Sequence, residues 1–171
     1  STSSQITLYE NMEKAAKALQ TSVKDLQNIN LGTDTDKEDT QESIKKKLLE
    51  QIDEFVGDYN SLYKFLEQAG GTTNSMFQKQ LKSSFTTNQK DLAEIGITMD
   101  AKGTLSIDSK TLEAADVDKL QKIFCDKDSF AARVSDKCET IKSCANSTIK
   151  VLNRMYGTQT AYNRYGTNGY Y

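Results

Sequence analysis

The apolar residues near the amino terminus recur in alternating steps of three and four, and this spacing restricts the fold more than any other feature. In residues 4–30 the repeat comprises Tyr9, Met12, Ala16, Leu19, Val23 and Leu26. A heptad seam of this kind buries its apolar edge only by packing against other helices. The chain also contains no Pro, the residue that interrupts helices most strongly. One long helix of a bundle is therefore predicted here.

Three further segments carry apolar stripes at helical spacing. The second helix, over about residues 37–69, has its stripe at Ile44, Leu48, Ile52, Phe55, Tyr59, Leu62 and Leu66. The third ends near residue 95 and has Phe77, Leu81, Phe85, Leu92 and Ile95. The last, over residues 128–156, has Phe130, Val134, Cys138, Ile141, Ala145, Thr148, Leu152 and Met155. Helices of thirty residues are about 45 Å long. The predicted fold is mainly α, an elongated antiparallel bundle or coiled coil of four long helices.

Polar residues and glycines mark the predicted boundaries. Thr35 and Glu38 are spaced as a capping box for the second helix. Gly70 and Gly71 are expected to end that helix, and residues 72–74 (Thr, Thr, Asn) offer N-caps for the third.

Two residues within the predicted helices do not fit a plain apolar stripe. Gly57 costs its helix about 1 kcal/mol relative to Ala, unless a neighbour must approach closely there. Asn88 lies in the third stripe. There it either fixes the register as a buried polar residue or lies exposed on a rotated face.

Between residues 92 and 115 the apolar period changes from helical to alternating and back. Ile97–Met99 and Leu105–Ile107 alternate apolar and polar residues, as short half-buried strands do. Residues 100–103 (Asp-Ala-Lys-Gly) fit a type I turn with Gly at the position that needs a positive φ. Asp108 is then a candidate N-cap. A small β-hairpin insertion is predicted near residues 97–107, followed by short helices over residues 109–115 and 117–124.

Three segments carry a family resemblance, in the right order and spacing. Residues 52–62 contain Phe-Val-x-x-Tyr-Asn-x-Leu, residues 96–108 form the hairpin segment, and residues 118–124 end in Ile-Phe. Together they resemble the carboxy-terminal helical region of the bacterial flagellar filament-capping protein, hook-associated protein 2. The resemblance covers residues 44–145. It leaves out the family's amino-terminal start and its large middle domains, as expected of a fragment, a fused excision or a reduced relative.

The resemblance implies a structural protein and not an enzyme. In that family, long terminal helices form the leg-like part of a ring-shaped cap, which sits on the growing filament and helps flagellin subunits to fold in place. The implied partners are copies of the chain, flagellin and other flagellar axial proteins. The implied location is extracellular, at the flagellum, after export from the cytoplasm through the flagellar channel. The alternative is a stand-alone extracellular helical interaction or adhesion module derived from the cap family.

Composition argues against most chemistry. The chain has no His, so the commonest general base and every His-dependent triad are missing. Its formal net charge is −2, with acids and bases interspersed, which is not the footprint of a nucleic-acid-binding protein. No apolar run reaches the length of a membrane span. No catalytic, cofactor-binding or metal-ligating residue is predicted, and no cofactor.

The acidic and cysteine side chains are predicted to have structural roles. The carboxylates that invite a calcium site fall at turn and cap positions without EF-hand spacing, namely Asp100, Asp108, Asp116 and Asp118. Cys138 and Cys144 are about 9 Å apart along a helix axis, too far for a disulfide, whereas Cys125 reaches either one only by a fold-back. Free thiols are the favoured interpretation for all three.

The last residues differ in composition from the rest of the chain. Residues 157–171 are rich in Tyr, Gly, Asn and Thr and have no aliphatic period. The predicted organisation is a helical bundle over residues 1–156 followed by a flexible tail over residues 157–171. The tail is alternatively an aromatic segment that becomes ordered on a partner.

Overall fold

A computed structural model describes residues 1–31 and 41–168, with the side chains of 30–31 and 158–168 excluded. Its elements are α1 (Thr2–Leu31), α2 (Gln41–Ala69), α3 (Gly71–Thr87), α4 (Gln89–Glu94), β1 (Ile97–Met99), β2 (Leu105–Ile107), α5 (Ser109–Ala114), α6 (Val117–Phe124) and α7 (Phe130–Asn168). The fold is mainly α with one antiparallel hairpin, which confirms the predicted class. The capping box at Thr35 and Glu38 lies outside the described residues.

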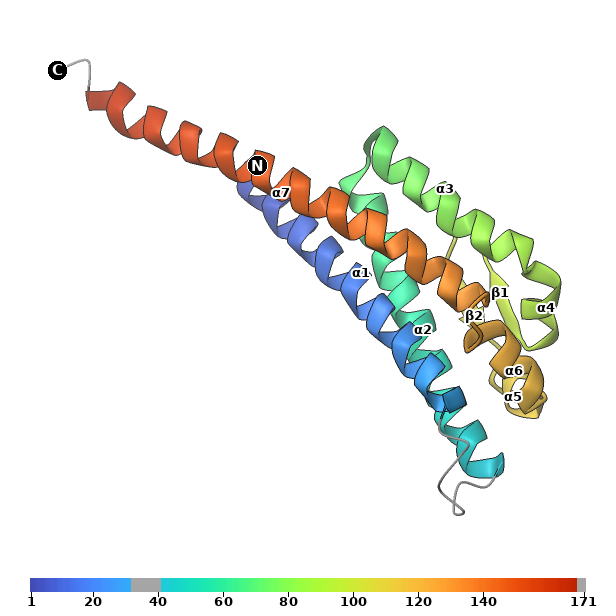
Figure 1. Ribbon diagram of the computed structural model, residues 1–171. Helices are drawn as coiled ribbons and strands as arrows, with labels where there is room; N and C mark the ends of the chain where they lie inside the picture. The colour runs from blue at the N-terminus through green and yellow to red at the C-terminus, as the bar shows by residue number, and fades with distance from the viewer. Residues whose placement is uncertain (32–40, 169–171) are drawn as a thin grey trace.

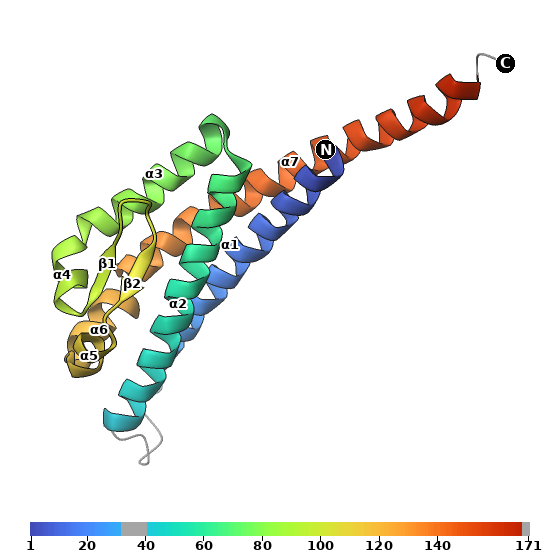
Figure 2. The same cartoon turned by 180° about the vertical axis from the view of Figure 1, so that it is seen from behind.

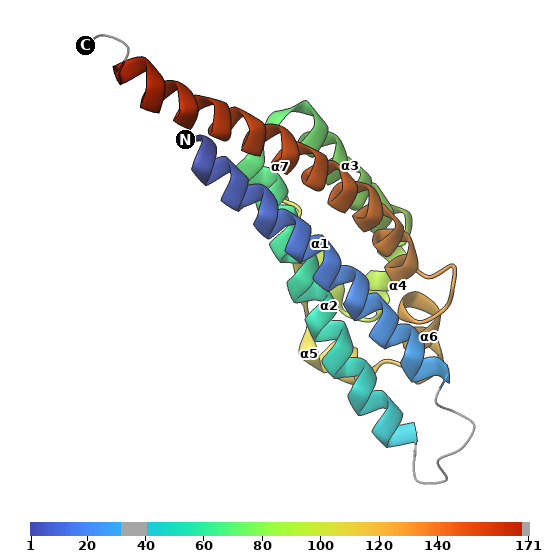
Figure 3. The ribbon, with the colours of Figure 1, turned by 60° about the vertical axis from the view of Figure 1, so that its left-hand side comes forward.

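The long helices α1 and α7 lie side by side and run in opposite directions, and α2 lies along α1 (Figures 1 and 3). Polar contacts show the direction, because Gln20 Nε2 donates to Glu139 Oε2 at 2.8 Å, whereas Asn146 Nδ2 donates to Glu13 Oε2 at 3.4 Å. Residue numbers therefore decrease along α1 as they increase along α7, so the two helices are antiparallel. The rod-like body follows from these paired helices.

The third predicted helix is interrupted before its predicted end near residue 95. α1, α2 and α7 have 30, 29 and 39 residues, but α3 has only 17. The break falls at Asn88, which has φ −112° and ψ 14° and whose side-chain amide donates to the Ser84 carbonyl at 2.9 Å. This half-buried Asn fits neither predicted role, since it ends one helix and precedes another. Three long helices and a shorter fourth segment therefore form the bundle.

The predicted stripes form the core. Met12, Leu19, Leu26, Leu48, Leu62 and Leu81 are all at most 1% exposed. At the centre, Phe55 meets Phe124 and Phe130 edge to face, with ring centroids 5.5 and 5.7 Å apart. Phe85 reaches the same cluster through Phe130, at 6.4 Å. Four separate helices therefore share one aromatic centre.

The hairpin has the predicted strands and turn. It pairs Ile97 with Ile107 and Met99 with Leu105, and it lies between α2 on one side and α3 with α4 on the other (Figure 2). In the turn, the Gly103 amide donates to the Asp100 carbonyl at 3.1 Å. Gly103 has φ 89°, and a Cβ there would lie 2.4 Å from the Tyr63 ring. Glycine is thus required both by the turn and by the close approach of α2.

A side chain on α2 fastens the hairpin to the bundle. The Asn60 amide donates to the Leu105 carbonyl at 3.0 Å, and its carbonyl oxygen accepts the Leu105 amide at 2.8 Å. These two bonds satisfy the outer edge of β2 as a neighbouring strand would. Asn60 belongs to the segment 52–62 that resembles the cap family, and its role here is positional.

Two predicted boundaries are wrong. α3 begins at Gly71 with Gly70 at the N-cap and no side-chain cap, so neither Thr72 nor Thr73 serves as one. Asn74 is instead buried within the helix, and its amide donates to the Tyr9 hydroxyl at 2.9 Å and the Gly70 carbonyl at 2.8 Å. Both glycines have positive φ, a conformation that glycine adopts without a steric penalty.

The second error concerns the last helix, which continues to Asn168 rather than ending near residue 156. No Pro interrupts this stretch, and an isolated Gly lowers helix stability without stopping a helix.

Gly57 offers a test of helix propensity separate from packing. It lies exposed within α2, and a Cβ built there meets no atom within 4 Å. Gly57→Ala is expected to raise the free energy of unfolding by about 1 kcal/mol in chemical denaturation, because Ala loses less backbone entropy. Gly103→Ala is the matched comparison and should destabilise. A Gly57→Ala variant less stable than wild type would contradict the free space seen at this position.

Candidate interaction surface

The carboxylates considered for calcium have local structural roles. Within residues 1–31 and 41–168, no group of three or more His, Cys, Asp or Glu could hold a metal ion. Asp100 accepts the Lys102 and Thr104 amides at 2.8 and 3.0 Å and so shapes the turn. Asp108 caps α5 by accepting the Thr111 amide at 3.0 Å, and this bond lowers the pKa of its carboxyl. Both carboxylates are engaged in local backbone structure.

Asp116 and Asp118 lie at the start of α6. Asp116 is at the N-cap position without a side-chain cap bond, and Asp118 is in the first turn. Carboxylates at such positions are favoured by the helix dipole. The structure therefore gives these two residues a helix-terminal location, as their sequence context suggested.

The three cysteines are free thiols, in two environments. Cys125 and Cys138 are buried, whereas Cys144 is half-buried on α7. Burial raises the pKa of the Cys125 thiol and of the Cys138 thiol to about 12 in each case. Because only the thiolate is nucleophilic, both buried groups are inert near neutral pH.

This difference predicts the order of chemical modification. Near pH 8, a thiol with a pKa of 12 is ionised in roughly one molecule in ten thousand. Native protein treated with iodoacetamide is therefore expected to gain one adduct, at Cys144, and guanidinium-unfolded protein three, as counted by mass spectrometry. Cys144→Ser should remove the native adduct. Rapid native modification of Cys125 or Cys138 would show that the core opens far more readily than its packing indicates.

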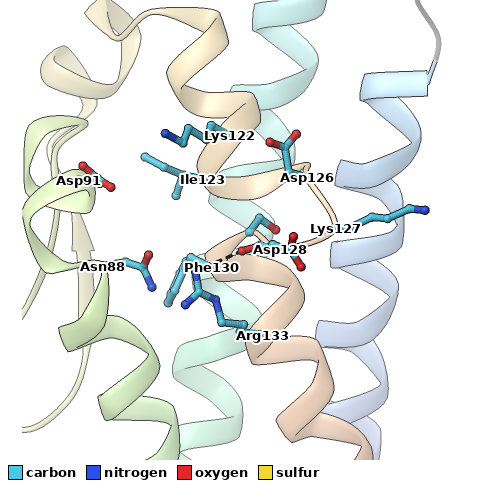
Figure 4. Close-up of a pocket in the computed structure, with 10 residues that line it drawn as sticks. Asn88, Asp91, Lys122, Ile123, Asp126, Lys127, Asp128, Phe130 and Arg133 are labelled. Carbon is cyan, nitrogen blue, oxygen red and sulfur yellow. Dashed lines mark hydrogen bonds between the residues drawn. The ribbon is translucent and has the colours of Figure 1, made fainter.

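A small pocket of about 210 Å³ lies where α4, α6 and the start of α7 meet (Figure 4). Ile123 and Phe130, 6% and 1% exposed, form its apolar part. Its polar lining carries both charge signs, as Asp91, Asp126, Asp128, Lys122, Lys127 and Arg133.

Two polar groups at this pocket are already used for structure. Arg133 Nη2 donates to the Asp128 carbonyl at 3.1 Å, and Ser129 Oγ accepts the Ala132 amide at 3.1 Å, which caps α7. These bonds shape the turn between α6 and α7. We interpret the pocket as a structural joint, because its opposing charges select no ligand class.

Most of the large exposed apolar side chains lie close together on α7. Among the described residues the large exposed ones are Met76, Val151, Met155 and Tyr156, and three of the four lie within six positions on α7. Here α7 lies beside the start of α1, and its later residues continue beyond it (Figures 1 and 3). The predicted stripe included Met155, which is 55% exposed, whereas Leu152 is 9% exposed. The buried stripe thus ends at Leu152. We call residues 150–156 the exposed end of α7.

The molecule is a rod of paired helices with a packed aromatic centre and exposed apolar side chains at one end. This combination is typical of a structural protein that acts through helix contacts. None of the described helices is long and apolar enough to cross a membrane. A sequence profile of the flagellar hook-associated protein 2 C-terminus matches residues 69–165, more than half of the chain. The chain belongs to this family. No curated protein and no solved structure matches it.

The match confirms the family resemblance and changes its limits. It begins at residue 69, so the segment 52–62 lies outside it. It also extends to residue 165, into the stretch that the resemblance had left out. The matched residues comprise α3, α4, the hairpin, α5, α6 and most of α7. Family membership associates the chain with the flagellum and its axial proteins.

Proposed function

We propose that this chain is a packing subunit of a flagellar filament cap, which promotes flagellin polymerisation at the filament tip and works outside the cell. The observation that carries the proposal is the family match over residues 69–165, which spans the hairpin and most of α7. In this role α1 and α7 form the leg, and the exposed end of α7 contacts neighbouring subunits or axial proteins. The chemistry is shape and burial, without a catalytic step.

The internal contacts support a rigid leg. Lys142 lies 3.0 Å from Glu139 and donates to Gln20 Oε1 at 3.2 Å, so α7 and α1 share a polar network. Gln20 in turn lowers the pKa of the Glu139 carboxyl by donating to it. These polar contacts lie beside the buried seam of α1 and α7, which holds the two helices together.

The test is the mass of the chain in solution and its binding to filaments. Light scattering combined with small-angle X-ray scattering should show a discrete oligomer of elongated subunits as concentration rises. Gold-labelled protein should bind the ends of purified flagellar filaments in electron micrographs. Val151→Ser with Met155→Ser should weaken end binding while circular dichroism is unchanged. An elongated monomer at every concentration, together with no binding to filament ends, would refute the proposal.

A second candidate function is a stand-alone extracellular interaction or adhesion module. It is favoured by the 45–55% exposure of Val151, Met155 and Tyr156, since such a surface suits any helical partner. Binding along other cell or protein surfaces, without preference for filament ends, would support this module over the cap.

We also propose that residues 1–156 fold as one body and that the segment beginning at residue 157 moves separately from it. α7 continues through Gly157 to Asn168, but an isolated helix of this length is marginal in water. Deleting residues 157–171 should leave the cooperative thermal transition of the bundle in place. A large loss of helical signal from residues 1–156 would show that the tail is part of the body.

A further inference from the structure

The carboxy-terminal part of this mildly acidic chain contains only basic charges. After Glu139 there is no Asp or Glu, whereas Lys142, Lys150, Arg154 and Arg164 all follow it. On α1, Glu10 is the carboxylate that lies beside Lys150 in the antiparallel register, and residues 1–9 carry no charged side chain. Beyond Glu10, the side chains at this end of the α1–α7 pair carry only positive charge, although the chain as a whole has a formal charge of −2.

Two of these basic residues lie within the exposed end of α7. Lys150 and Arg154 are exposed, and neither forms an ion pair with a described residue. Residues four apart lie on the same helix face. Lys150 and Arg154 thus form one ridge, beside the apolar ridge of Val151 and Met155. Leu152 and Tyr156 form a third ridge next to it.

We propose that the exposed end of α7 binds an amphipathic helix of a partner protein whose apolar stripe is bordered by Asp or Glu. The groove beside Val151 and Met155 would take the apolar stripe, and the carboxylates would meet Lys150 and Arg154. This inference rests on the proposed function in that the partner is an axial protein, and it adds the chemistry of that partner.

Charge also argues against the most immediate alternative occupant. The same end of a second copy would bring Lys150 and Arg154 against their own counterparts, and Glu10 is the one carboxylate on α1 beside them. Like charges across an interface oppose association. An acidic amphipathic helix would bring carboxylates to the two basic side chains. Its apolar stripe would cover the three exposed apolar side chains.

The test uses two synthetic helical peptides of roughly 20 residues. They share one apolar stripe and differ only in having Glu or Lys along its borders. Fluorescence anisotropy with the full chain is expected to show on the order of tenfold tighter binding of the Glu peptide, and a smaller difference at high salt. Lys150→Glu with Arg154→Glu should reverse the preference. Val151→Ser with Met155→Ser should weaken both peptides.

A matched control and the opposing outcomes make the test decisive. Lys79→Glu with Lys82→Glu changes two exposed lysines on α3 and should leave the preference unchanged. Equal binding of both peptides, no binding of either, or an unaltered preference after charge reversal at residues 150 and 154 would overturn the inference. The filament assay is read separately. Binding to filament ends without peptide discrimination rejects only this inference, and discrimination without end binding rejects only the cap function.

Discussion

Leu105→Asp is expected to destabilise the protein by roughly 3–5 kcal/mol, enough to leave it largely unfolded at moderate urea concentrations. Leu105 is 3% exposed and belongs to β2, which faces the bundle. The substitution removes apolar burial and places a carboxylate at a buried position. The loss should be read from the urea midpoint and from the thermal transition followed by circular dichroism.

The neighbouring position supplies the control. Ser106 lies on the other side of the same strand and is exposed. Ser106→Asp should change the free energy of unfolding by no more than about 0.5 kcal/mol, as surface substitutions usually do. The pair therefore tests strand alternation itself. Equal stability of both variants would mean that the hairpin does not pack on α2 as described.

Phe55→Ala is the second large effect, with an expected loss of about 3–5 kcal/mol. Phe55 is fully buried, and its ring lies 5.5 Å from that of Phe124 and 5.7 Å from that of Phe130. Removing it leaves a cavity at the point where α2, α6 and α7 meet, and these rigid helices cannot close around it. Denaturant titration measures the change.

Two further variants separate the cavity from other effects of the substitution. Phe55→Leu keeps part of the volume and should lose clearly less stability than Phe55→Ala. Glu54→Ala changes an exposed residue one position earlier on α2 and should be nearly neutral. A Phe55→Ala variant as stable as Glu54→Ala would place the aromatic cluster outside the cooperative core.

Residue spacing was enough to predict the hairpin in detail. The strands Ile97–Met99 and Leu105–Ile107, the turn glycine and the Asp108 cap all occur as predicted. Each of these features depends on a few neighbouring residues, through side-chain alternation, a positive φ or a cap bond. The Asn60 clamp was not predictable in the same way, because it joins residues 45 positions apart along the chain.

The sequence by itself determined that the chain forms long amphipathic helices, a short hairpin and a shared apolar interior. Those features follow from local backbone preferences and from the periodicity of apolar residues. Only the tertiary structure decided that α3 ends before Asn88 and that Val151, Met155 and Tyr156 are exposed. Periodicity specifies which face of a helix is apolar. Whether that face is buried depends on which side chains the neighbouring helices bring against it, and that is a property of the assembled bundle.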